Sequence, residues 1–167
     1  VPTMLSDIHG VHELMLGLEV RFLANRDRQL HFALLTDFTD AATQTMPQDE
    51  VLLQLASTRI NELNQKYGYG KNETFFLLHR PRLWNERERT WMGVERKRGK
   101  LGDLNALLRG QGGERFSLIV GDITPLLQVK YVITLDTDTQ LPRDTAREFI
   151  ATLMHPLNHA VHDPRSG

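Results

Sequence analysis

The sequence predicts an α/β fold, a Rossmann-like open parallel sheet with flanking helices, and three observations support this class. Apolar runs at 30–36, 75–78 and 131–136 have the length and composition of buried strands. Segments of helical periodicity separate them, and this alternation implies a parallel sheet with right-handed crossovers. Polar residues follow the strands, at the edge where open α/β sheets bind ligands.

The first strand and helix are predicted at the start of the chain. Residues 1–4 are expected to end a strand, and Ser6 or Asp7 can cap the helix that follows. The apolar face of this helix repeats at helical spacing, with Val11, Leu14, Met15, Leu18 and Phe22. The run at 30–36 predicts a second strand that ends at Asp37-Phe-Thr-Asp40.

Three more helices and two more strands are predicted after Asp40. Pro47 suits the first turn of a helix whose apolar face contains Val51, Leu52, Leu55, Ile60 and Leu63. A short strand at 75–78 and a charged loop come next, and then a helix from Leu101 to Arg109 that Gly110 stops. The strand at 131–136 precedes a last helix from Asp144 to Met154, capped by Asp144.

Composition indicates a single globular domain over residues 1–167. The net charge of −1 gives no general attraction to nucleic acid or anionic lipid, and the absence of cysteine excludes disulfides and thiolate metal sites. No apolar run approaches the roughly 20 residues that span a bilayer. Because the chain lacks an initiator Met and opens inside an expected strand, we expect a partial domain, a fragment of a longer protein.

The two carboxylates of Asp136-Thr-Asp138 directly follow the last predicted strand. There they could hold a hard divalent cation, Mg²⁺ or Mn²⁺, and the cation could hold phosphates. By itself Asp-x-Asp is a weak signal, since acidic residues also favour turns and helix caps. We expect Thr3, Asp37 with Asp40, and Asp136 with Asp138 to converge, because three strands end at these positions.

The segment 80–100 provides the positive charge that a phosphate site needs, since both the Gly-x-Gly-x-x-Gly pattern and the phosphate-loop Lys motif are absent. It contains eight basic and three acidic residues, and both tryptophans of the chain, Trp84 and Trp91. A solvated loop and a nucleic-acid surface are alternatives. A cationic clamp for a diphosphate-linked sugar fits best, because Gly99-Lys100 precedes a predicted helix and tryptophan faces stack on sugars.

These motifs resemble the donor half of a GT-A, family-2-like glycosyltransferase, and within that fold the glycosyltransferase domain of bacterial cyclic β-1,2-glucan synthases. The most specific stretches are Phe-Leu-Leu-His-Arg-Pro-Arg-Leu-Trp-Asn at 76–85 and Trp-Met-Gly-Val-Glu-Arg-Lys-Arg-Gly-Lys at 91–100. Val94 stands where the family pattern predicts Trp. The resembling segments span nearly the whole chain: 32–42, 75–85, 91–110, 131–147 and 154–158.

The resemblance implies a role for each candidate residue. Asp37 is the uridine-side contact with Thr3 beside it, and Lys97 or Lys100 meets the donor diphosphate. Asp136 and Asp138 hold Mg²⁺ or Mn²⁺, and Asp136 also reaches the ribose.

The resemblance further implies an inverting transfer of glucose from UDP-glucose to a growing β-1,2-glucan acceptor. Inversion needs a general base, which the fold places after this chain, so no catalytic residue is expected here and the isolated fragment is expected to be inactive. Family members are multi-pass inner-membrane proteins, so this segment would lie at the cytoplasmic face beside the remainder of its parent chain. It would neither span the membrane nor bind nucleic acid.

Two other functions fit parts of the pattern. Haloacid-dehalogenase-like phosphatases also place Asp-x-Asp after a strand, but their pattern has Thr or Val where Gln140 stands. Their motif also normally lies near the start of the domain, whereas Asp136 comes late in this chain. A non-enzymatic interaction module would use Asp136 and Asp138 only to solvate a turn and would dock an acidic partner on the basic loop.

Overall fold

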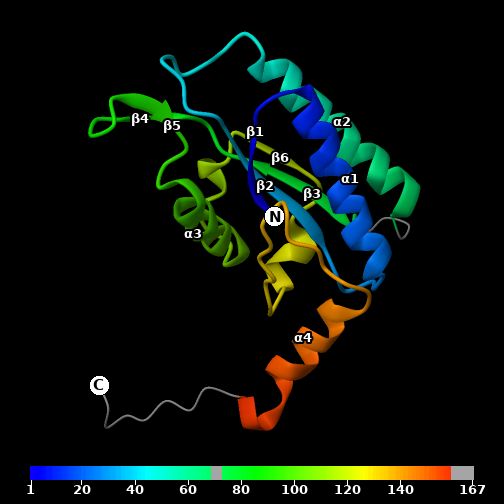
Figure 1. Cartoon of the computed structure of the whole chain (residues 1–167). Helices are drawn as coiled ribbons and strands as arrows, with labels where there is room; N and C mark the ends of the chain where they lie inside the picture. Colours follow the sequence, from blue (N-terminus) through cyan, green and yellow to red (C-terminus); the bar gives the residue numbers. More distant parts are fainter. Residues whose placement is uncertain (69–72, 159–167) are drawn as a thin grey trace, which may run out of the picture.

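A computed structural model of the chain describes residues 1–68 and 73–158 and contains a four-stranded, mostly parallel sheet (Figure 1). The strand order is β1-β2-β3-β6, in which the first three strands run parallel and β6 pairs antiparallel with β3. The strands are β1 Pro2–Leu5, β2 Phe32–Phe38, β3 Phe75–His79 and β6 Leu118–Val120. The predicted α/β class with a mainly parallel sheet is confirmed, and the antiparallel β6 is an addition to it.

Two helices, α1 (Ile8–Ala24) and α2 (Asp49–Tyr67), cover one face of the sheet (Figure 1). The side chain of Asp7 caps α1 by accepting a hydrogen bond from the Gly10 amide at 2.8 Å, as predicted. The main core lies here, because alternate strand residues such as Leu34 and Leu77 point toward these helices. The predicted apolar face of α1 is the buried one.

The other face of the sheet packs against α3 (Arg96–Leu108). Leu35 and Leu78, which alternate with the residues of the main core, form a second core cluster with Leu107 and Phe116. The helix begins five residues before the predicted Leu101, so Arg96 and Lys97 belong to its first turn. Because α3 starts earlier than predicted, the helix backbone sets the positions of Arg96 and Lys97.

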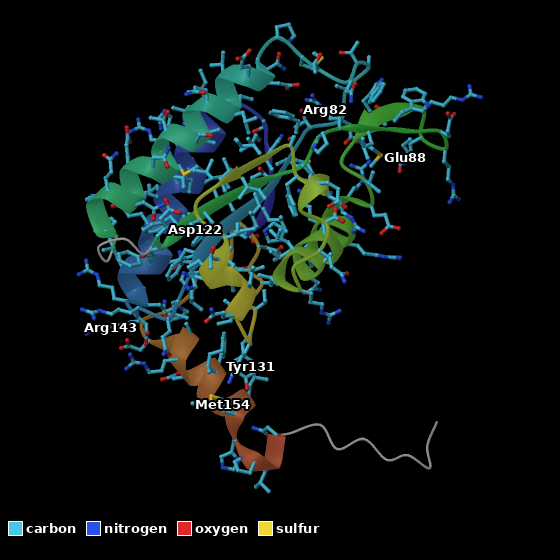
Figure 2. All side chains as sticks on the ribbon, turned by 180° about the vertical axis from the view of Figure 1, so that it is seen from behind. Arg82, Glu88, Asp122, Tyr131, Arg143 and Met154 are labelled. Atoms are coloured by element: carbon cyan, nitrogen blue, oxygen red, sulfur yellow. The ribbon has the colours of Figure 1, made fainter. Side chains whose placement is uncertain are left out.

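The segment 80–95, predicted as a charged loop, contains a β-hairpin of β4 (Leu83–Asn85) and β5 (Thr90–Met92). Trp84 and Trp91 face each other across it with ring centroids 5.8 Å apart. The prediction of a loop was wrong because the dense charges of this segment hide two strands of three residues each. Figure 2 shows that the hairpin, near Arg82 and Glu88, lies at the opposite end of the molecule from Met154.

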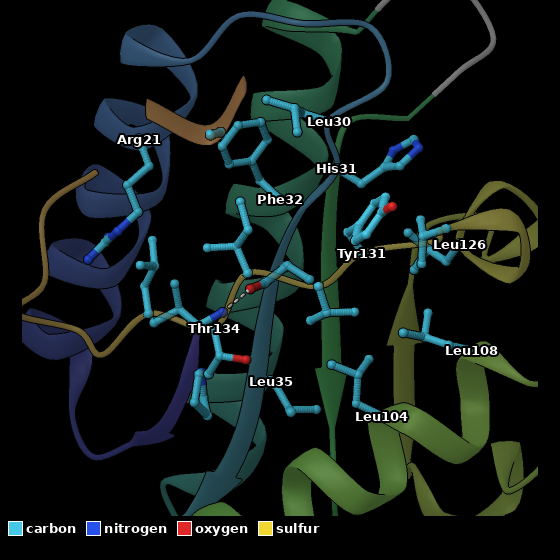
Figure 3. Close-up of a pocket in the computed structure, with 18 of the residues that line it drawn as sticks. Arg21, Leu30, His31, Phe32, Leu35, Leu104, Leu108, Leu126, Tyr131 and Thr134 are labelled. Carbon is cyan, nitrogen blue, oxygen red and sulfur yellow. Dashed lines mark hydrogen bonds between the residues drawn. The ribbon is translucent and has the colours of Figure 1, made fainter. Parts of the chain in front are cut away.

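The segment 131–136, predicted as a buried strand, is not a strand of the sheet. Its residues Tyr131 to Leu135 extend along an apolar pocket lined also by Leu35, Leu78 and Leu104 (Figure 3). Tyr131 and Val132 remain 39% and 50% exposed. An apolar run indicates a segment that is buried on at least one side. Here one side of the run lines the pocket, and its backbone forms no strand hydrogen bonds with the sheet.

The last helix, α4, spans Thr145–Met154, close to its predicted bounds. Asp144 does not cap it as predicted, because its backbone is left-handed (φ 61°) and its side chain makes no capping hydrogen bond. Three short 3₁₀ turns complete the described elements: η1 Gly113–Arg115, η2 Thr124–Gln128 and η3 Pro156–Asn158. No helix within 1–68 or 73–158 has the length and apolar character needed to cross a bilayer.

Candidate donor-binding cleft

All six predicted site residues line one cleft of about 490 Å³. Its walls come from the ends of β1 and β2, the first turn of α3 and the turn at 136–138. The predicted residues in it are Thr3, Asp37, Lys97, Lys100, Asp136 and Asp138, with Asp40 beside them. The expected convergence of polar residues is therefore present, although Asp136 and Asp138 reach it from an irregular segment instead of a strand.

Asp37 forms the buried floor of the cleft. Its side chain is 3% exposed and accepts hydrogen bonds from Arg80 Nε at 2.9 Å and Nη2 at 3.0 Å. The Lys100 Nζ lies 3.3 Å from the second carboxylate oxygen and also donates to the Thr3 carbonyl. Because both cations are buried with it, Asp37 is held in one place by paired charges.

Arg80, at the end of β3, connects this floor to α3. Its Nη1 donates to Asp103 at 2.6 Å, and its Nη2 donates to the carbonyls of Val94 and Arg96 at 3.1 and 3.3 Å. Burial alone would lower the pKa of Arg80, but its hydrogen bonds to Asp37 and Asp103 raise that pKa above its ordinary value. Arg80 therefore stays charged and fixes the first turn of α3 over the cleft.

The two candidate lysines have different surroundings. Lys100 is buried, and burial lowers the pKa of its ammonium while Asp37 opposes that change. Lys97 has a side chain 51% exposed at the cleft rim, where it forms an ion pair with Asp136, whose side chain is 57% exposed. Of the two, only Lys97 can turn toward a ligand without breaking a buried ion pair, since Lys100 is paired with the buried Asp37.

Asp136 and Asp138 supply oxygen donors of the kind that Mg²⁺ and Mn²⁺ prefer. Within the described parts of the chain, no group of three or more His, Cys, Asp or Glu side chains is arranged to hold a metal ion. Two carboxylates on an open rim suit an ion that takes its other ligands from phosphates and water. The donor set therefore fits a metal that binds together with a diphosphate.

Two buried arginines of this region were missed by the sequence predictions. Arg80 comes two residues after the predicted strand at 75–78, and this position near a strand end could have indicated it. Arg21 falls on the apolar face of α1, seven residues after Leu14, and a charge on that face was a detectable signal. The structure places Arg21 beneath the turn that carries Asp136 and Asp138.

A second cavity, of about 170 Å³, contains none of the predicted site residues. Leu35, Leu104, Leu108 and Leu126 line it, and Tyr131 lies along one side (Figure 3). Its walls are mainly aliphatic, and Arg21 and His31 are among the few polar residues that line it.

His79, the last residue of β3, is expected to make the stability of the chain sensitive to acid. It is fully buried, its Nδ1 lies 2.8 Å from Thr36 Oγ1, and burial lowers its pKa to about 4. The unfolded chain takes up this proton near the ordinary histidine pKa and the folded chain only near pKa 4, so stability is lost as pH falls between these values. We expect His79 to account for about 2–3 kcal/mol of the loss between about pH 7.5 and about pH 4.5.

Urea unfolding of wild-type chain and of His79→Asn at both pH values measures this contribution. Asparagine keeps a hydrogen-bonding atom for Thr36 and does not titrate, so the variant is expected to lose less stability on acidification. An equal loss in the two proteins would contradict the assignment to His79.

Comparison with known proteins identifies one relative by sequence. No protein-family model matches the chain. The chain is 44% identical over 166 residues, 99% of its length, to the cyclic beta-(1,2)-glucan synthase NdvB of Rhizobium meliloti (strain 1021). It spans only 6% of the length of that protein. The identity along almost the whole chain supports the relationship to cyclic β-1,2-glucan synthases that the motifs indicate, and the similarity is to one small segment of such a synthase.

Proposed function

We propose that this chain is the donor-binding part of an inverting GT-A glycosyltransferase that transfers glucose from UDP-glucose into cyclic β-1,2-glucan. The observation that carries the proposal is the convergence of Thr3, Asp37, Lys97, Lys100, Asp136 and Asp138 on one cleft. The similarity to a segment of a cyclic glucan synthase supports the choice of substrate. In the proposed reaction, an acceptor hydroxyl oxygen bonds to the glucose anomeric carbon, and UDP leaves with the electron pair of the broken bond.

The chain's own residues would bind and orient the leaving group. The floor at Asp37 and Thr3 would receive the uridine side of the donor, and Lys97 would release Asp136 to meet the diphosphate. Asp136 and Asp138 would hold Mg²⁺ or Mn²⁺, which when bound stabilises the negative charge that develops on UDP. The proposal assigns the acceptor proton to a general base outside these residues, so turnover of UDP-glucose by the 167-residue chain alone would contradict it.

Titration calorimetry of the chain with UDP, with and without Mn²⁺, tests donor binding. We expect UDP to bind only with Mn²⁺ present, and Mn²⁺ alone to bind weakly, because two carboxylates are an incomplete ligand set. The variant Asp138→Ala should remove the dependence on Mn²⁺. Absence of UDP binding by a folded sample, unchanged by Asp138→Ala, would favour the non-enzymatic interaction module.

Lys97→Met is expected to weaken UDP–Mn²⁺ binding about 10- to 100-fold, because it removes a charged hydrogen bond to the diphosphate. Arg98→Met is the matched control, since Arg98 has a side chain 87% exposed, pairs with Glu95 and does not line the cleft. Titration calorimetry with UDP and Mn²⁺ measures both variants. Equal weakening by both would show a general effect of net charge and would contradict a clamp at Lys97.

A further inference from the structure

The turn that carries the two candidate metal ligands receives its support from helix α1. Because 131–136 forms no strand, the sheet does not hold the turn by a hydrogen-bond ladder. Arg21 lies under it instead, with its Nη2 at 3.2, 2.8 and 2.7 Å from the carbonyl oxygens of Asp136, Thr137 and Thr139. One guanidinium group therefore gathers three carbonyls of a four-residue turn.

The surroundings of Arg21 are unusual for a buried charge. The residue is 8% exposed, and among the described residues no carboxylate pairs with it. Its Nε is buried without a hydrogen-bond partner. Burying a guanidinium without a counter-ion costs free energy, and the carbonyls of the turn provide the compensating partial charges. A leucine at this helical position would pack without that cost. Packing alone therefore does not explain an arginine here, and its hydrogen bonds to the turn carbonyls do.

Asn25, one helical turn after Arg21, holds the chain that follows. Its Nδ2 donates to the carbonyls of Leu141 and Pro142 at 3.3 and 3.1 Å, and its Oδ1 accepts from the Ala146 amide at 3.0 Å. The segment from Asp136 to Ala146 is thus hydrogen-bonded to the end of α1 by two side chains, Arg21 and Asn25, that lie one helical turn apart. The main chain of the turn faces α1, while Asp136, Thr137 and Asp138 line the cleft.

We propose that Arg21 is a positioning residue: it fixes the Asp136–Thr139 turn so that both carboxylates face the cleft, and thereby sets the metal-dependent affinity of the cleft for a nucleoside diphosphate. This inference rests on the proposed function. The last turns of α1 would then set the position of the two candidate metal ligands, although α1 itself contributes no ligand.

Arg21→Met tests this, because methionine keeps an apolar stem and removes every donor. Met15→Ala is the matched control: Met15 is buried in the main core on the same helix, its loss leaves a cavity there, and it lines neither the cleft nor the pocket along 131–135. Thermal unfolding first establishes how much stability each variant loses. Hydrogen exchange of the peptide 136–142 and titration with UDP and Mn²⁺ are then measured on the full chain.

We expect Arg21→Met to speed exchange of this peptide at least about tenfold and to weaken UDP–Mn²⁺ binding about 10- to 100-fold, the usual effect of losing a residue that orients metal ligands. Arg21→Lys, which keeps the charge and part of the donor set, should be intermediate in both measurements. Met15→Ala should lose stability with little change in either.

Unchanged exchange and affinity in Arg21→Met, or the same changes in Met15→Ala, would overturn the inference while leaving the proposed function intact. Absence of UDP–Mn²⁺ binding by the wild-type chain would overturn the proposed function itself and the inference with it. The exchange of 136–142 separates these cases, because it reports on the turn without any ligand.

Discussion

Arg80→Met is expected to lower the free energy of unfolding by about 3–5 kcal/mol, because removing one member of a buried ion pair leaves its partner's charge uncompensated. Arg80 contacts Asp37 through two nitrogens and Asp103 through a third. The Asp37 carboxylate would retain only Lys100, and the carbonyls of Val94 and Arg96 would lose their donor. Urea unfolding at neutral pH measures the loss.

Arg115→Met is the control for this prediction. Arg115 pairs with the same Asp103 at 2.8 Å, but its side chain is 53% exposed. Solvent screens an exposed pair, which therefore contributes little to stability, so this variant should be nearly as stable as the wild-type chain. Similar losses for the two variants would contradict the view that buried charge pairing, and not the contact with Asp103, holds α3 over the cleft.

The buried strands of the sheet could be predicted from sequence, and the short ones could not. The runs around Leu34–Leu35 and Leu77–Leu78 are continuously apolar because both faces of these strands are covered. The end of β2 was predicted at Thr36, yet the strand continues to Phe38, since Arg80 allows the charged Asp37 to be buried inside it. Strand β6 has only three residues, too few to show a period.

The location of the candidate site followed from topology, whereas its internal contacts did not. Parallel strands end at one edge, so the meeting of Thr3 and Asp37 could be expected, whereas the Asp136 turn reaches them from a segment that is not a strand. The choice between Lys97 and Lys100 depends on where α3 begins, and the predicted start at Leu101 left both outside the helix. The support of the turn by Arg21 joins residues 115 or more apart in the chain, which no local pattern encodes.

Gly93→Ala is expected to destabilise the chain by about 3–5 kcal/mol and to abolish UDP–Mn²⁺ binding. A Cβ at this position would lie 3.0 Å from the Asp37 Cβ and closer still to the carboxylate. Arg80 and Lys100 hold that carboxylate, so it cannot move aside without breaking buried ion pairs. Since Gly93 also lines the cleft, the displaced floor would change the donor site itself.

Gly102→Ala makes the same chemical change where there is room, because beyond the adjacent residues and the backbone of its own helix no atom lies within 4 Å of the Cβ that it would add. Gly102 is inside α3, where alanine restricts the unfolded chain and favours the helix, so this variant should gain about 0.5–1 kcal/mol. Urea unfolding and UDP–Mn²⁺ titration of both variants decide the matter. Opposite signs for two identical substitutions would isolate the close approach of the backbone to Asp37 as the cause. A stable Gly93→Ala that still binds UDP would instead mean that the floor of the cleft can shift, and that the charge pairs around Asp37 do not fix it.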